Sequence, residues 1–120
     1  MTSHATMVTV TPLLPAGPSL TEALRFYAEQ LGFAVIWHDG GMAGVRRGPV
    51  EFNLVQNGDR HWAENTSLSI GVDDLDALYE EYRAIDARVG PLEVKSWGRR
   101  EFHVVLPSGV CFQFYQAPDA

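Results

Sequence analysis

The sequence has little of several features that would each mark a particular class of protein. Its 120 residues include one cysteine, Cys111, so no disulfide can form within the chain, and a cytoplasmic location is predicted. No stretch approaches the roughly eighteen apolar residues of a membrane-spanning helix, so no membrane association is expected. The stretch from Met1 to Met7 lacks both the basic start and the apolar core of a secretory signal, and none is predicted.

Basic side chains are also scarce, and the chain has a net charge of −6. Residues 1–60 carry four basic and five acidic side chains, whereas residues 61–120 carry five basic and ten acidic ones. Without a basic stripe the chain is a poor candidate for binding nucleic acid, whose phosphates require Lys and Arg. The acidity favours either attraction of a cationic small molecule or solubility alone, and composition leaves both open.

Groups for nucleophilic or metal chemistry are sparse as well. Cys111 has no basic or histidine neighbour in the sequence, which indicates a buried apolar residue rather than a nucleophile. His61 and Glu64 are three positions apart in a polar stretch without a third ligand, which favours a solvated pair over a metal site. His38 and His103 fit ordinary surface or hydrogen-bonded histidines, with ligand contact as the alternative for His103. The sequence has no Ser-His-Asp set and no glycine-rich phosphate loop.

The chain does contain a repeated pattern of strands and helices. Alternation over residues 7–14 predicts a strand, in which Pro12 marks an edge, a bulge or the point where the strand leaves its own sheet. A helix is predicted from Ser19, where Glu22 completes a capping box, to Gly32. Predicted next are strands over 33–38, 42–47 and 50–55, and a polar loop over 57–65.

The same order then recurs in the second half. A strand over 67–72 precedes a helix capped by Asp73 and Asp76, and the predicted strands that follow cover 92–97, 100–106 and 110–115. Leu20 and Tyr27 of the first helix match Leu75 and Tyr82 of the second at an offset of 55 residues. We therefore predict one α+β domain over residues 1–120, built from two β-α-β-β-β modules at about 7–56 and 66–117. One helix covers only one sheet face, so two such sheets placed edge to edge would form a curved mixed sheet around a concave groove, a natural ligand site.

The final hairpin carries the most informative side chains. Its link, residues 106–109, places Pro107 and Gly109 where a turn favours them. In the last strand Gln113 shares a face with Cys111, opposite the face of two phenylalanines. A polar side chain at this place fits either a plain exposed strand face or a sheet that faces a ligand.

Several motifs occur in the same order as in a known superfamily. They are Thr11-Pro12-Leu13-Leu14, Leu31-Gly32-Phe33, Met42-Ala43-Gly44-Val45, Val72-Asp73-Asp74-Leu75, Trp97-Gly98-Arg99 with Glu101-Phe102, and Pro107-Ser108-Gly109. On these motifs the chain resembles the vicinal-oxygen-chelate superfamily, which includes glyoxalase I, extradiol dioxygenases and bleomycin-resistance proteins. The Trp-Gly-Arg motif before the final hairpin is most similar to the bleomycin-resistance group. The turn differs from that of the enzymes, because Leu106 and Val110 replace Asp and Asn.

The resemblance also implies where a metal would be held, since the metal enzymes take His, Glu or Gln ligands from four strands. The matching positions here are Thr11 or Pro12, Ser67, the run Glu51-Phe52-Asn53, and Gln113. A divalent catalytic centre needs about three strong protein ligands, and this set offers one carboxylate and one amide. We therefore predict neither a metal nor another cofactor.

The resemblance implies a non-catalytic binding protein that sequesters a bulky cationic aromatic compound, most simply a bleomycin-type antibiotic, and so gives drug resistance. Aromatic side chains would stack on the ligand and carboxylates would supply negative charge. The ligand-binding residues predicted are Trp37, Asp39, Met42, Phe52, Trp97, Glu101, His103 and Gln113. A homodimer is expected, possibly with exchanged N-terminal strands, because the resemblance implies grooves at a dimer interface. The alternative is a metal-dependent lyase, dioxygenase or antibiotic-modifying thiol transferase.

Overall fold

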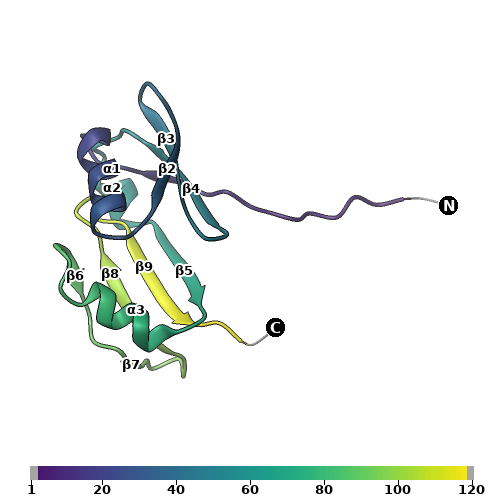
Figure 1. Ribbon diagram of the computed structural model, residues 1–120, viewed down its shortest axis with the longest axis vertical. Coiled ribbons are helices and arrows are strands. Elements are labelled where there is room, and N and C mark those ends of the chain that lie inside the picture. Colours follow the sequence, from purple (N-terminus) through teal and green to yellow (C-terminus); the bar gives the residue numbers. More distant parts are fainter. Residues whose placement is uncertain (1–2, 119–120) are drawn as a thin grey trace.

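A computed structural model describes residues 3–118 and contains two β-α-β-β-β modules (Figure 1). The first module, the upper one in Figure 1, contains β1 (Leu13–Pro15), α1 (Leu20–Glu29), β2 (Ala34–Asp39), β3 (Met42–Arg47) and β4 (Val50–Val55). A short helix, α2 (Arg60–Glu64), follows it. The second module contains β5 (Ser67–Val72), α3 (Leu75–Tyr82), β6 (Arg88–Val89), β7 (Glu93–Val94), β8 (Arg100–Val105) and β9 (Cys111–Gln116). Its short strands β6 and β7 both pair with β8 and together take the place of β2 in the first module. The predicted α+β fold of two repeated modules is confirmed.

Each module forms its own mixed sheet, and the two sheets have the same topology. The first has the strand order β1-β4-β3-β2 and the second β5-β9-β8-β6, with β7 also paired to β8. In both sheets the first strand is parallel to the last strand, and the remaining pairs are antiparallel. Among residues 3–118 no strand ladder joins the two sheets, so the predicted curved surface is divided between two modules.

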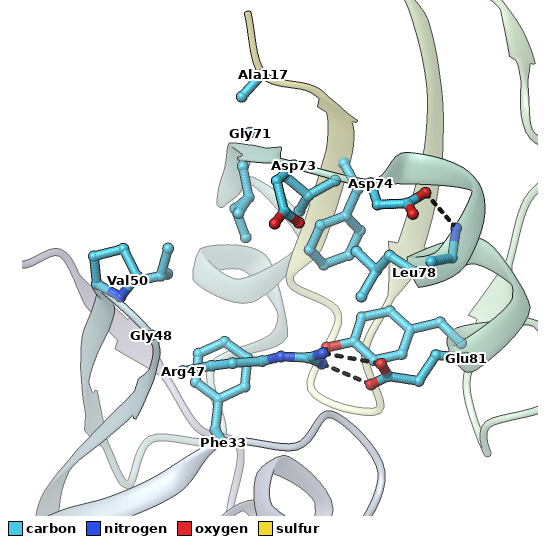
Figure 2. A pocket seen from close by; sticks show the side chains of 16 residues that line it. Phe33, Arg47, Gly48, Val50, Gly71, Asp73, Asp74, Leu78, Glu81 and Ala117 are labelled. Atoms are coloured by element: carbon cyan, nitrogen blue, oxygen red, sulfur yellow. Dashed lines mark hydrogen bonds and ion pairs between the residues drawn. The ribbon is translucent and has the colours of Figure 1, made fainter. Parts of the chain in front are cut away.

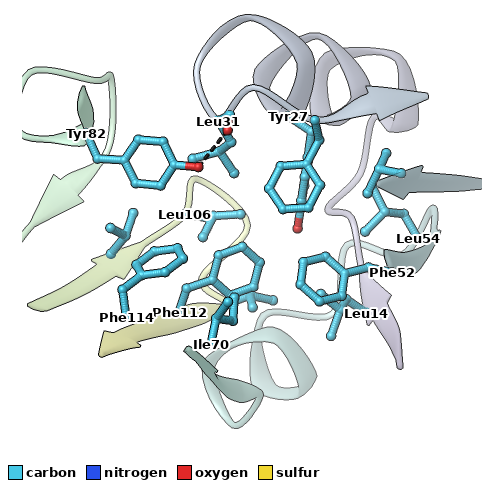
Figure 3. Packing of buried hydrophobic residues seen from close by; sticks show 14 of the residues in the cluster. Leu14, Tyr27, Leu31, Phe52, Leu54, Ile70, Tyr82, Leu106, Phe112 and Phe114 are labelled. Atoms are coloured by element: carbon cyan, nitrogen blue, oxygen red, sulfur yellow. Dashed lines mark hydrogen bonds between the residues drawn. The ribbon is translucent and has the colours of Figure 1, made fainter. Parts of the chain in front are cut away.

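The modules share an apolar core between them (Figure 3). Phe52 from β4 and Phe112 from β9 meet with ring centroids 5.4 Å apart, and Tyr27 from α1 lies edge-on to Phe112 at 6.3 Å. The Tyr82 hydroxyl at the end of α3 donates a buried hydrogen bond of 2.6 Å to the Leu31 carbonyl, which ties the second module to the first (Figure 3). Each sheet therefore turns its apolar face to the shared core and its other face outward.

The helices follow their capping residues. Ser19 caps α1 by accepting from the Glu22 amide, as predicted, and α1 ends at Glu29, before Gly32 takes a φ of 77°. The N-cap of α3 is Asp74, not the predicted Asp73 or Asp76, because only the residue immediately before the first turn can accept from the Ala77 amide. Within residues 3–118 no helix is long and apolar enough to cross a bilayer.

The predicted polar loop over 57–65 is wrong in part, because it contains α2. Asp59 accepts hydrogen bonds from the amides of His61 and Trp62, and so caps this short helix. The predicted strand over 92–97 is also wrong in extent. Only Glu93–Val94 pairs with β8 there, and the two-residue β6 pairs with another part of β8. The predicted run over 92–97 includes β7 but misses β6, because a two-residue strand is too short to show an alternating pattern.

The N-terminal strand is far shorter than the predicted run over 7–14. β1 begins at Leu13, and residues 3–12 extend away from both modules (Figure 1). The Pro12 carbonyl still accepts from the Asn53 amide at 2.9 Å, so the chain leaves its own sheet at this proline. On the N-terminal side of Pro12, Met7, Val8 and Val10 are 99%, 84% and 87% exposed. We call residues 3–12 the N-terminal arm.

Candidate functional site

The outward face of the first sheet, here called the first outer face, carries Trp37, Asp39, Met42, Gly44 and Asn53. Strand alternation and register place these five residues on one face, since Trp37 pairs with Gly44, Asp39 with Met42, and Gly44 with Asn53. The Trp37 indole lies directly over Gly44, where any Cβ would overlap the ring. A register shift between Val35 and Trp37 gives β2 the irregularity that places the indole there.

Asn53 has an unusual environment on this face. Its Oδ1 is buried and has no hydrogen-bond partner in the described part of the chain. A buried acceptor without a donor costs roughly 1–3 kcal/mol. A donor from outside the chain would remove that cost, which makes Asn53 a candidate contact that the sequence named only as a position matching a metal ligand.

The outward face of the second sheet, the second outer face, is organised around one buried carboxylate. Glu101 is 0% exposed, and its Oε1 accepts from the Trp97 Nε1 at 2.7 Å and the Arg99 Nε at 3.0 Å. Its Oε2 lies 2.7 Å from the His103 Nε2. Burial alone would raise the pKa of Glu101, but these three hydrogen bonds and the Arg99 charge together lower the pKa below its usual value. An ionised carboxylate can only accept, so the His103 Nε2 carries the proton and donates.

A second set of contacts continues across the sheet from Arg99. Its Nη2 donates to the Ser69 hydroxyl at 3.1 Å, and that hydroxyl donates to Gln113 Oε1 at 3.0 Å. The Arg99 guanidinium also lies over the Tyr115 ring, with Cζ 4.0 Å from the centroid. Side chains from β5, β8 and β9 thus form one hydrogen-bonded surface.

The aromatic part of the second outer face is Trp97. Its side chain is 60% exposed, and its ring lies nearly parallel to that of His103, at 15° with centroids 6.1 Å apart. Gly98, at φ 92°, lets the chain turn so that Trp97 folds back over β8. Trp97 therefore presents a flat surface whose orientation is set by its hydrogen bond to Glu101.

The eight predicted site residues are divided by the structure. Trp37, Asp39 and Met42 lie on the first outer face; Trp97, Glu101, His103 and Gln113 lie on the second. The prediction for Phe52 is wrong: it is buried in the core and stacks on Phe33 at 5.5 Å, because alternation along β4 turns it to the apolar side. Glu101 is also corrected, since its carboxylate is enclosed by protein donors and does not face a ligand.

Sequence reasoning missed Ser69 and Tyr115 and gave Arg99 no role in the site. The spacing of Trp97, Arg99, Glu101 and His103 at every second residue was the available signal, because such residues share a face of a strand. Ser69 could not be identified before the register was known.

A cavity of about 610 Å³ lies elsewhere, at the junction of the two modules (Figure 2). Arg47 from β3 and Glu81 from α3 meet across it in a bidentate ion pair of 2.6 and 2.9 Å. Arg47 also donates to the Leu31 carbonyl and the Tyr82 hydroxyl. None of the eight predicted residues lines the cavity, and these polar groups satisfy one another, so we interpret it as a structural junction.

The strand positions that hold metal ligands in the enzymes of the resembled superfamily carry poor metal ligands or apolar side chains here. Register places Ser69, rather than the predicted Ser67, beside Gln113, and Leu13, rather than Thr11 or Pro12, beside Asn53. Within residues 3–118 no three His, Cys, Asp or Glu side chains come close enough together to hold a metal ion.

Comparison with known proteins identifies the family. The pattern of the glyoxalase/bleomycin resistance protein/dioxygenase superfamily matches residues 13–114. The chain belongs to this superfamily. Its two modules and the sheet order of each thus follow a shared architecture.

Individual members are similar to this chain over nearly its whole length. A bleomycin resistance protein of Geobacillus stearothermophilus is 25% identical, with 88% of this chain and 93% of that protein covered. The crystal structure of a bleomycin-binding protein from Streptomyces verticillus, in complex with copper(II)-bleomycin, is 31% identical with a TM-score of 0.84, covering 96% of this chain and all of the other. A bleomycin resistance determinant encoded on the transposon Tn5 is 24% identical and shares the fold, with a TM-score of 0.80 and coverage of 94% and 100%.

Proposed function

We propose that this protein is a non-catalytic binder that sequesters a bulky cationic aromatic compound of the bleomycin type. The observation that carries the proposal is the exposed Trp97 indole, held on the second outer face by a buried carboxylate. An exposed tryptophan fixed in one orientation binds a flat heterocycle with little loss of side-chain freedom. The similarity to a protein solved with copper(II)-bleomycin supports the same class of ligand.

The proposed functional unit is a homodimer. The two outer faces lie on separate sheets, so each chain would supply one half of a groove for a large ligand. The N-terminal arm supports an exchange between subunits, because its apolar side chains are exposed and it has left its own sheet at Pro12. Among residues 3–118 β5 pairs only with β9, so β5 has one free edge. Such an edge accepts an added strand from a partner.

Titration with bleomycin tests the proposed function. We expect saturable binding by calorimetry and a rise in melting temperature, because a ligand that binds only the native state stabilises it by about 2.7 kcal/mol at one hundred times its Kd. Metal-free and copper-loaded drug should be compared, and the drug recovered after incubation should have an unchanged mass. A melting temperature that does not change at millimolar bleomycin would exclude a bleomycin-binding function. Recovery of chemically altered drug would instead indicate an enzyme that modifies it.

A further inference from the structure

The charge available to a ligand on the second outer face is opposite in sign to that of the chain as a whole. Glu101 is the carboxylate at the centre of this face, yet it is fully buried. Both of its oxygens already accept, from Trp97, Arg99 and His103. A ligand cation therefore has no access to this negative charge.

The groups that remain accessible are mainly hydrogen-bond donors. The Arg99 side chain is 38% exposed, and its bonds to Glu101 and Ser69 use two of its five N–H groups, which leaves three for a ligand. Gln113 uses its Oε1 to accept from Ser69, which leaves its amide N–H₂ for other partners. At the border of the face, Arg88 on β6 adds a further cation, while the Glu93 carboxylate on β7 is paired with Lys95 at 3.1 Å.

Next to these donors lies the flat surface of Trp97 and His103. From this juxtaposition we propose that the second outer face takes a planar aromatic group bearing a carboxylate or a similar hydrogen-bond acceptor. Arg99 and Gln113 bind the acceptor, Trp97 and His103 contact the ring, and Glu101 is a positioning residue that orients them. The inference rests on the proposed function and refines it: the cationic part of a bulky ligand belongs away from this face, for example near the exposed Asp39 of the first outer face.

Two probes that share a ring and differ in charge test the proposal. Indole-3-acetate and tryptamine are titrated separately into the full-length protein, and the NMR signals of the Trp97 indole N–H and the His103 ring are followed. We expect indole-3-acetate to shift both signals with an affinity about tenfold higher than that of tryptamine, which corresponds to about 1.4 kcal/mol, because its carboxylate accepts a hydrogen bond from the charged Arg99 and tryptamine has no such acceptor. Equal affinities, or a preference for tryptamine, would overturn the proposal.

Two matched variants test whether Arg99 causes the preference for indole-3-acetate over tryptamine. Arg99→Gln should abolish it, whereas Arg83→Gln, which removes the same charge from an exposed pair with Glu80 on α3, should leave it unchanged. Loss of the preference in both variants would mean that net charge, rather than Arg99, selects the probe.

The positioning role of Glu101 has its own signature. In the native protein the His103 ring should show the tautomer with the proton on Nε2. Glu101→Gln offers an amide N–H₂ in place of one carboxylate oxygen, so His103 should change to the tautomer with the proton on Nδ1, and affinity for indole-3-acetate should fall. If the variant does not fold, the tautomer of the native protein decides the point: a proton on Nδ1 at neutral pH would exclude the proposed orientation. Bleomycin calorimetry runs beside these titrations, because an absence of bleomycin binding with a retained preference for indole-3-acetate would reject the proposed function alone.

Discussion

At the scale of single residues, the site depends on a contrast between one buried charge and one exposed ring. Glu101 is enclosed by three donors that come from positions two or four residues away along the chain. Trp97, one of those donors, keeps most of its ring exposed. The enclosed carboxylate therefore restrains an aromatic side chain that would otherwise sample several rotamers.

Removal of that ring should reduce binding more than stability. In Trp97→Ala, loss of stacking should cost roughly 0.5–1.5 kcal/mol of bleomycin affinity, while the free energy of unfolding should fall far less than the roughly 3–5 kcal/mol expected for a core tryptophan. Calorimetry and urea denaturation measure the two effects. A loss of stability as large as that of a core tryptophan would contradict a role of Trp97 mainly in ligand binding.

The lowered pKa of Glu101 predicts how stability depends on pH. A carboxyl group whose pKa is lower in the folded state stabilises the protein above its unfolded pKa, near 4.3, and loses that contribution as pH falls through the folded value. Urea midpoints of the native protein and Glu101→Gln should therefore differ most at pH 6–7, and the difference should shrink as pH falls below the unfolded pKa and through the lower folded pKa. A difference between the two urea midpoints that stays constant down to pH 3 would show that ionisation of Glu101 does not contribute to the stability of the fold.

At the scale of elements, α3 connects the two modules through its last turn. Tyr82 donates to the Leu31 carbonyl, and burial raises the pKa of Tyr82 to about 12, with Arg47 opposing the rise, so the phenol remains a donor at neutral pH. The neighbouring ion pair of Arg47 and Glu81 is only partly buried, with side chains 37% and 45% exposed. The hydrogen bond, rather than the ion pair, should contribute most of the polar stabilisation at this junction.

Tyr82→Phe tests this element. We expect a loss of about 0.5–1.5 kcal/mol in the free energy of unfolding, because the ring still fills its place in the core while the hydroxyl loses its bond to the Leu31 carbonyl and the bond it accepts from the partly exposed Arg47. Tyr79→Phe is the control: Tyr79 lies on the same helix and packs edge-on to Phe102 at 5.1 Å. Equal losses in the two variants would mean that the hydroxyl of Tyr82 adds nothing specific to the junction.

At the scale of the whole molecule, the N-terminal arm is the part that needs explanation. It extends from the modules with its apolar side chains exposed (Figure 1). Exposed apolar side chains in an alternating segment favour association with another sheet edge. Exchange of the arm between two copies would bury these side chains without altering either module.

Light scattering at micromolar concentration should give about twice the 13.3 kDa mass of one chain. Deletion of residues 1–10 should reduce both dimerisation and melting temperature if the arm is exchanged. A monomeric full-length protein would reject the dimer, and a truncated chain that keeps its mass and melting temperature would reject the exchange.

The sequence by itself determined the repetition of modules, the position of α1 and the final hairpin. These features depend on local chemistry: the alternation of apolar residues, the Ser19 cap, and the Pro107 and Gly109 turn act over a few neighbouring residues. The same locality explains why β3, β4 and β5 lie where alternation predicts them.

Only the tertiary structure decided which face of each strand is covered and which groups converge. Alternation separates Phe52 from Asn53 but does not say which side meets the core, and packing against Phe33 and Phe112 settles that question. Strand register brings Ser69 to Gln113, a pairing between residues 44 positions apart. The three donors to Glu101 lie within four residues of it along the chain, but the sequence does not show that they close over its carboxylate and bury it, which requires the chain to fold back at Gly98.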